Sequence, residues 1–209
     1  MAKVLVTSDW HISPSFDLVN KLSEHIDYCE GQLTRGYRII LPGDIFNALE
    51  CGWGAYRHHP IIKRLSQWDN LDIIEGNHDR KNPYLPTKLS VLIDNIFFCH
   101  GHQFDMLWGC LPIYRFPIPH FIQRWYRTPA KKKKGELRDY HLASMQIEYS
   151  AGKVALKNGY KAIIFGHTHL PMIIWREAFI LANCGDGVDS FSFLELDTET
   201  LDIQLRDYS

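Results

Sequence analysis

The sequence contains few cysteines, and none of them lies at the spacing of a metal-binding pair. The five are odd in number and far apart in the chain: Cys29, Cys51, Cys99, Cys110 and Cys184. Disulfide frameworks and thiolate zinc sites need paired or closely spaced cysteines. This distribution therefore argues against both and favours a reducing compartment.

Long apolar runs are also missing, since no stretch approaches the roughly 20 apolar residues of a membrane-spanning helix. A strand-like run at residues 3–6 begins almost at the N-terminus and leaves no room for a signal peptide. The formal net charge is only -1, with 45% hydrophobic and 22% charged residues, which is typical of a folded globular protein. We expect a single domain over residues 1–209 and a cytoplasmic location, with peripheral contact at the inner face of the membrane as an open alternative.

Apolar runs of strand character alternate with helix-like spacing along the first part of the chain. Predicted strands cover residues 4–7, 37–41, 71–74, 96–99 and 162–165. Predicted helices cover residues 15–35, a stretch around 61–68, and about 139–158. Short strands follow at residues 172–175, 179–181, 191–196 and 201–205. This order predicts an α/β core that is extended by antiparallel strands.

Each of the first five predicted strands ends in polar side chains that can bind a metal ion. They are Asp9 and His11, then Asp44, then Asn77 with His78, then His100, and finally His167 with His169. A turn, a helix cap or a hydrogen-bonded histidine pair explains each motif singly. The carboxyl ends of strands converge on one crevice in an open α/β sheet, so the five motifs together predict one composite site.

The order of these motifs resembles that of the calcineurin-like metallophosphoesterases. The family signature appears here as Asp9-Trp10-His11, Gly43-Asp44, Gly76-Asn77-His78-Asp79, His100 and Gly166-His167-Thr168-His169. The resemblance implies an α/β fold of four layers, an α/β/β/α sandwich of two mixed sheets flanked by helices. It also implies two metal positions that share Asp44. The first would be held by Asp9, His11, Asp44 and His169, and the second by Asp44, Asn77, His100 and His167.

The chemistry of this ligand set favours divalent transition metals. Imidazole, carboxylate and amide groups without thiolate suit manganese, which we expect first, and also iron, nickel or zinc. Two such ions about 3.5–4 Å apart can hold a phosphate and bind a hydroxide that attacks phosphorus. We therefore expect a phosphoesterase that cleaves a phosphodiester or pyrophosphate bond. His78, with its ring oriented by Asp79, is expected to protonate the leaving oxygen or to stabilise charge on the phosphoryl group.

One position departs from the family pattern. Many members carry an acidic residue three positions after the aspartate of Gly-Asp, where this chain has Asn47. That position is not usually a ligand, so we expect Asn47 to tune the metal site from outside it. Asn183 and Asp186, near the end of the chain, are expected either at the rim of the site or in a tight turn at Gly185.

A basic, aromatic insert at about residues 105–138 separates the fourth and fifth motifs. Residues 113–138 carry a net charge of +7, so the rest of the chain sums to about -8. We expect a cap or lid that binds the substrate through Arg124 and Arg127. His102, just ahead of the insert, is also expected to bind the substrate. A solvated loop is the alternative for Lys131–Lys134. The layout is similar to that of the wider group related to the UDP-diacylglucosamine pyrophosphatases, although His78 stands where those enzymes usually have arginine.

Three functions remain open on the sequence. The first is hydrolysis of a nucleotide-linked or lipid-linked phosphate ester. Lysines of the insert would then contact anionic groups, and its aromatic side chains would contact the organic part of the substrate or a membrane surface. A nuclease would place phosphates on the cations and bases on the aromatics. A non-catalytic, metal-binding interaction scaffold belongs to a different class, and the complete ligand set with His78 argues against it.

Overall fold

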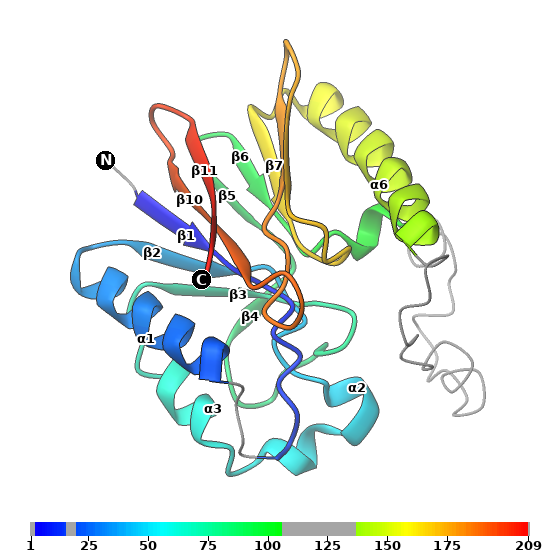
Figure 1. The fold of residues 1–209 in the computed structure, drawn as a ribbon. Coiled ribbons are helices and arrows are strands. Elements are labelled where there is room, and N and C mark those ends of the chain that lie inside the picture. The colour runs from blue at the N-terminus through cyan, green and yellow to red at the C-terminus, as the bar shows by residue number, and fades with distance from the viewer. Residues whose placement is uncertain (1–2, 16–19, 106–136, 209) are drawn as a thin grey trace.

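The computed structural model describes residues 3–15, 20–105 and 137–208, which form two packed β-sheets (Figure 1). The first sheet has the strand order β11-β10-β1-β2-β3-β4. Its strands are β1 (Lys3–Val6), β2 (Arg38–Leu41), β3 (Leu71–Ile74), β4 (Thr87–Lys88), β10 (Ser192–Asp197) and β11 (Asp202–Asp207). Strands β1 to β4 run parallel, whereas β10 and β11 are antiparallel to their neighbours, so the sheet is mixed.

The second sheet is also mixed and has the strand order β5-β6-β7-β9-β8. Its strands are β5 (Val91–Ile93), β6 (Ile96–Phe98), β7 (Ala162–Phe165), β8 (Met172–Trp175) and β9 (Ile180–Asn183). Strands β6, β7 and β9 are parallel, and β5 and β8 close the two edges in antiparallel fashion.

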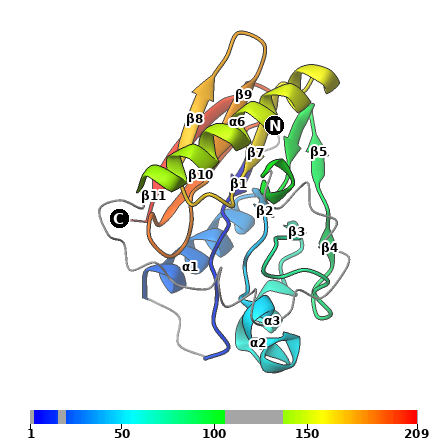
Figure 2. The same ribbon diagram turned by 90° about the vertical axis from the view of Figure 1, so that its right-hand side faces the viewer.

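Helices cover the outer faces of both sheets (Figures 1 and 2). Helices α1 (Asn20–Thr34) and α3 (Pro60–Leu65) lie on the first sheet, and α6 (Leu137–Asn158) lies across the second. A one-turn helix α2 (Ala48–Cys51) and two short 3₁₀ helices, at Trp53–Tyr56 and His102–Phe104, lie in the loops.

Side chains of β1 show how the layers form. Val4 and Val6 point into the apolar core between the sheets, whereas Leu5 packs in the outer core with Leu22 and Ile26 of α1. This alternation follows from the two-residue period of a strand, and both faces are apolar because both are covered. The structure therefore confirms the predicted four-layer α/β/β/α sandwich.

The loops after the parallel strands remain paired beyond the strand ends. The amide of Asp9 donates to the carbonyl of Gly43 (3.1 Å), and the amide of His11 donates to that of Asp44 (3.0 Å). In the second sheet the amide of Gly166 donates to the carbonyl of His100 (3.0 Å). Backbone hydrogen bonds thus fix the motif residues of neighbouring strands against each other.

No helix in the described ranges is both long enough and apolar enough to cross a membrane.

Candidate metal centre

Five of the motif residues adopt a backbone conformation that side-chain-bearing residues rarely adopt. Positive φ angles occur at Asp9 (54°), His11 (45°), Asp44 (53°), His167 (70°) and His169 (55°). Such left-handed residues cost of order 1–3 kcal/mol each and concentrate where function requires a particular side-chain direction. All five lie at strand ends, and the backbone there turns their side chains toward one another.

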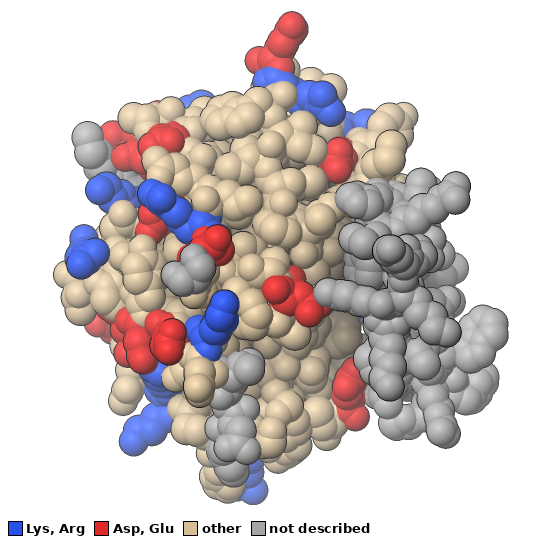
Figure 3. Space-filling model, in the orientation of Figure 1, with Lys and Arg blue, Asp and Glu red and all other residues tan. Residues whose placement is uncertain are grey.

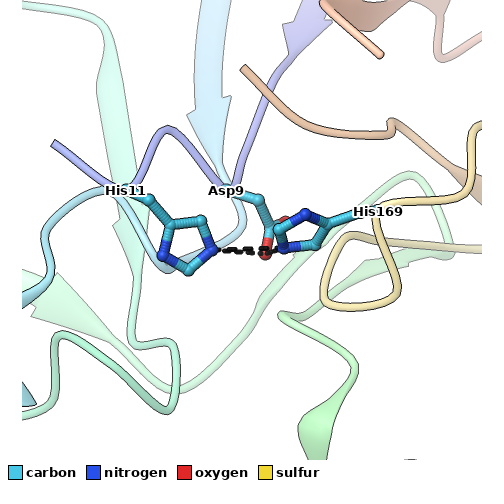
Figure 4. A group of neighbouring side chains, drawn as sticks. All are labelled: Asp9, His11 and His169. Carbon is cyan, nitrogen blue, oxygen red and sulfur yellow. Dashed lines mark hydrogen bonds and ion pairs between the residues drawn. The ribbon is translucent and has the colours of Figure 1, made fainter. Parts of the chain in front are cut away.

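The first group consists of Asp9, His11 and His169 (Figure 4). The Nε2 atoms of the two histidines lie 3.2 Å apart. Oδ1 of Asp9 lies 3.3 Å from Nε2 of His169 and 3.8 Å from Nε2 of His11. Three potential ligand atoms from the loop after β1 and the loop after β7 therefore surround one small volume.

The hydrogen bonding of Asp9 tests whether a metal ion fits this group. Its Oδ2 accepts hydrogen bonds from the hydroxyl of Ser8 (2.5 Å) and the amide of His167 (2.9 Å). Its Oδ1 is buried and accepts none from the residues that the structure describes. A buried carboxylate oxygen without a donor is costly unless a cation satisfies it. The orphaned oxygen faces two imidazole nitrogens, which fits a divalent ion.

The second group consists of Asp44, His100 and His167. Oδ2 of Asp44 lies 3.3 Å from Nε2 of His100, and the same nitrogen lies 3.0 Å from Oδ1 of Asn77. The ring of His100 lies 5.0 Å from that of His167. Asp44, His100 and Asn77 are buried, and His167 is nearly so.

Asp44 connects the two groups. It also forms a third cluster with His11 and His78. Its carboxylate therefore lies within 4.8 Å of candidate ligand atoms of His11 on one side of the site and of His100 and His167 on the other. The amide of His78 donates to Oδ1 of Asp44 at 2.7 Å, which holds the carboxylate in place. The geometry thus suits the bridging position that the sequence predicts for this residue.

Two glycines allow the loops to approach this closely. A Cβ atom at Gly76 would lie 2.0 Å from Oδ1 of Asp44, and one at Gly166 would lie 2.3 Å from Oδ2 of Asp9. Both distances are far inside van der Waals contact. The loops that carry Asp44 and Asp9 therefore require glycine at these positions.

In three of the histidines, Nδ1 contacts a partner outside the candidate ligand set, and this contact orients the ring. Nδ1 of His100 donates to the carbonyl of Pro42, and Nδ1 of His11 lies 2.8 Å from Oδ1 of Asn47. Nδ1 of His169 lies 3.7 Å from Oδ2 of Asp186. These contacts leave the three Nε2 atoms directed into the site. The predicted tuning role of Asn47 agrees with its contact to His11.

Neighbouring carboxylates change the acidity of the histidines. Burial alone would lower the pKa of His100, but the charge and contact of Asp44, together with the charge of Asp9 and the carbonyl of Pro42, outweigh it and raise the pKa to about 9. Burial would also lower the pKa of His169, but the carboxylate of Asp9, together with the charges of Asp186 and Asp44, outweighs it and raises the pKa to about 9. Burial lowers the pKa of His102 to about 3, helped by repulsion from His100. The centre of the site thus favours positive charge, which is the electrostatic condition for binding cations.

The predicted pairing of His78 with Asp79 is wrong. Oδ2 of Asp79 accepts hydrogen bonds from the amides of Ile45 (2.7 Å) and Phe46 (3.4 Å), and Oδ1 accepts one from the amide of Gly76 (2.9 Å). Asp79 is buried among backbone donors and connects the loop after β2 to the loop after β3. Among the described parts of the chain, Nδ1 of His78 has no hydrogen-bond partner, and its Nε2 lies 4.0 Å from Oδ2 of Asp44.

The predicted substrate-binding residues have different outcomes. His102 lies next to the site, with its ring 5.3 Å from that of His100. Arg124 and Arg127 lie outside the described residues, as does most of the predicted cap. Asn183 and Asp186 are fully buried, which excludes the rim and favours the alternative of a tight turn at Gly185, whose amide donates to Oδ1 of Asn183 at 2.8 Å.

Asn183 supports the loop after β7 from beneath. Its Nδ2 donates to the carbonyl of Gly166 (2.7 Å) and to the hydroxyl of Thr168 (2.9 Å). The sequence motifs do not indicate this support, nor the contacts of Ser8 with Asp9 and of Asp105 with His167. Ser8 directly precedes a motif, which is the one signal that could have indicated it.

Comparison with known proteins places the chain in a family. A search of curated proteins finds no match. Among solved structures, an archaeal phosphodiesterase aligns with a TM-score of 0.54 and 18% identity over 98% of both chains. A hypothetical protein of Pyrococcus horikoshii OT3 aligns with a TM-score of 0.54 and 14% identity, over 99% of this chain and 88% of that one. Vps29 of Entamoeba histolytica gives a TM-score of 0.49 and 14% identity over 99% of both chains.

The two matches with a TM-score of 0.54 share little sequence with this chain and support the fold alone. The family assignment comes from the sequence itself, because residues 2–171 match the family described as calcineurin-like phosphoesterase. This region contains all five motifs and most of the two sheets. The chain therefore belongs to the calcineurin-like phosphoesterase family.

Proposed function

We propose that the protein is a phosphoesterase that uses two divalent metal ions to hydrolyse a phosphodiester or pyrophosphate bond. The observation that carries the proposal is the position of Asp44 between two histidine-containing groups, which is what a shared carboxylate ligand requires. Asp9, His11 and His169 would complete the first metal position, and Asn77, His100 and His167 the second. Manganese is the first choice for both, because the donors are nitrogen and oxygen without thiolate.

When bound, the ions would polarise the phosphoryl group and supply a nucleophilic oxygen from water. The chain itself fixes the positions of the two carboxylates, those of Asp44 and Asp9, that would bind the ions. Asp44 is held by the amide of His78, and Asp9 is held by Ser8 and the amide of His167. Their carboxylates therefore need little rearrangement during the reaction, which is the condition for electrostatic preorganisation.

His78 is the proposed catalytic side chain. Its ring lies 4.9 Å from that of His11 and is 27% exposed, so it borders the site and remains accessible to a substrate. In the proposed division of ligands it binds neither ion. A ring nitrogen can then donate a proton to the leaving oxygen or a hydrogen bond to a phosphoryl oxygen. Asp79 contributes indirectly, by joining the two loops that carry Asp44 and His78.

We propose a nucleotide-linked or lipid-linked substrate, bound with help from the insert. Lys, Arg, Asp and Glu side chains of the described residues are interspersed over the face in Figure 3, and they gather into no basic patch there. The basic excess of the chain lies in residues 113–138. Cationic binding of a second phosphate, a headgroup or a polymer would therefore depend on Arg124, Arg127 and the neighbouring lysines.

A nuclease is the second candidate, since the same insert interleaves aromatic residues with its cations. Bases stack on aromatic side chains while phosphates contact cations in single-stranded complexes. The two candidates share the metal centre and differ only in what the insert binds.

Hydrolysis by the metal-loaded protein tests the proposal. Protein stripped with a chelator and reloaded with Mn²⁺ is assayed on bis-p-nitrophenyl phosphate, nucleotide-diphosphate lipids, and single- and double-stranded DNA and RNA. Activity that requires metal and is lost in Asp44→Asn supports the proposal. Cleavage of polymer in preference to the small substrates selects the nuclease. Metal-loaded protein that cleaves nothing in the panel contradicts both.

A further inference from the structure

In each candidate histidine ligand, one ring nitrogen contacts a partner that is not itself a proposed ligand. Nδ1 has this role in His11, His100 and His169, whose partners are an amide, a carbonyl and a carboxylate. His167 differs from the other three. Its contact runs through Nε2, which lies 3.3 Å from Oδ2 of Asp105.

Asp105 is held firmly at this position. It follows the 3₁₀ helix His102–Phe104, which begins two residues after His100 at the end of β6. Phe104 is buried with Ile147 of α6 and Phe165 of β7, and so anchors the turn in the outer core. The side chains of Asp105 and His167 are only 13% and 11% exposed, so little water competes for their contact.

We infer that Asp105 is a positioning residue that presents Nδ1 of His167 to the second metal position. A neutral imidazole carries a proton on only one of its two nitrogens. If that nitrogen donates to a partner, the other nitrogen has the free lone pair that can bind a metal ion. With Nε2–H donating to Asp105, the lone pair lies on Nδ1. The inference rests on the proposed function in one respect, since it takes His167 as a ligand.

The charge of Asp105 has a further effect that a neutral partner would not have. A carboxylate accepting the ring proton increases the electron density of the imidazole and strengthens its bond to a cation. His11, at the first position, contacts the neutral amide of Asn47 instead. Asp105 therefore stabilises ion binding at the second position specifically, while Asn47 orients a ligand at the first.

Two substitutions separate orientation from charge. Asp105→Asn keeps an oxygen that accepts the Nε2 proton but removes the charge. Asp105→Ala removes both. We expect affinity for the second ion to fall about 10-fold in the first variant and up to about 100-fold in the second. Affinity at the first position should stay unchanged in both. Asn47→Ala is the matched control and should weaken the first position instead.

The measurement uses the full chain and needs no catalytic turnover. Crystals of each variant are soaked at graded Mn²⁺ concentrations, and anomalous scattering gives the occupancy of each position. In metal-free protein, long-range ¹H–¹⁵N correlation spectra of the imidazoles report which nitrogen of His167 carries the proton. Wild type should show the Nε2–H form. Asp105→Asn should retain it, and Asp105→Ala should lose the preference.

Several results would overturn the inference. An Nδ1–H form of His167 in wild type would do so, as would equal loss of both ions in Asp105→Ala, or Mn²⁺ bound through Nε2 of His167. Circular dichroism of each variant distinguishes these results from misfolding. If two Mn²⁺ ions bind as described but no phosphoester is cleaved, the proposed function fails while the role of Asp105 stands.

Discussion

Asn47 contacts His11 at two points, through the ring and through the backbone. Oδ1 of Asn47 lies 2.8 Å from Nδ1 of His11, and its Nδ2 donates to the carbonyl oxygen of His11 at 3.1 Å. His11 has a positive φ of 45°, so the second contact holds a strained backbone in place. One amide thus fixes both the position of the residue and the direction of its ring.

Replacement of Asn47 should weaken the metal centre without unfolding the protein. Asn47→Ala removes both contacts, and we expect Mn²⁺ affinity at the first position to fall about 10–100-fold. Asn47→Asp retains an acceptor for Nδ1 and should recover most of this loss. Isothermal titration with Mn²⁺ measures the effect. Equal affinity in wild type and Asn47→Ala would contradict the role assigned to the amide.

Asp44 and His78 should respond differently to substitution, although they are neighbours. Asp44 belongs to both histidine groups, so Asp44→Asn should remove both ions and all activity. His78→Ala should keep two ions and slow turnover by about 10²–10⁴-fold, the usual contribution of a proton-transfer group. Metal analysis alongside kcat makes the distinction. Parallel loss of metal in the two variants would show that His78 is a ligand.

Gly76 should be intolerant of even the smallest side chain. A Cβ there would lie 2.0 Å from Oδ1 and 2.3 Å from the amide nitrogen of Asp44, and neither the buried carboxylate nor the backbone can move away easily. We expect Gly76→Ala to displace Asp44 and abolish tight metal binding. Gly36→Ala is a useful comparison, because Gly36 also has a special backbone (φ 84°) but open space around it. It should lower thermal stability and leave metal binding unchanged.

The sequence predicts which motif side chains lie close together better than it predicts the contacts that support them, for a physical reason. Candidate ligands such as Asp44 and His100 follow apolar strands, and the convergence of strand ends is a general property of α/β sheets. The partners of Asp79 are backbone amides of Ile45 and Gly76, which leave no trace in residue identity. The pairing of Asp105 with His167 spans 62 positions and depends on how β6 and β7 lie side by side.

The shortest helices and strands cannot be predicted from the sequence for a different reason. Strands β4 and β5 contain two and three residues, and α2 contains four, which is too short to show a helix or strand period. The long helices were predicted from apolar spacing, and Leu22, Ile26 and Cys29 of α1 are buried as expected. The spacing gave no indication that the polar His25 is buried on the same face.

His25 should make the stability of the fold sensitive to acid. Its ring stacks on that of Tyr208 at 3.6 Å, and its Nε2 lies 3.4 Å from Sγ of Cys29. Burial lowers its pKa from 6.5 to about 3. The titratable side chains that contact it, Cys29, Tyr28 and Tyr208, have pKa values that burial raises, so they stay neutral in acid.

The sign of the effect follows from proton binding. Between pH 6.5 and about 3 the unfolded chain binds a proton at His25 and the folded chain does not, so the free energy of unfolding decreases as the pH falls through this range. One proton corresponds to about 1.4 kcal/mol per pH unit. His25→Phe keeps the stacked ring and removes the titration, and its stability relative to wild type should therefore rise steadily below pH 6.5. Urea unfolding of metal-free protein measures this, with His58→Gln, at an exposed histidine, as the control. A constant difference between His25→Phe and wild type from pH 7 to 4 would mean that His25 titrates in the folded protein as it does in the unfolded chain, and would contradict the prediction.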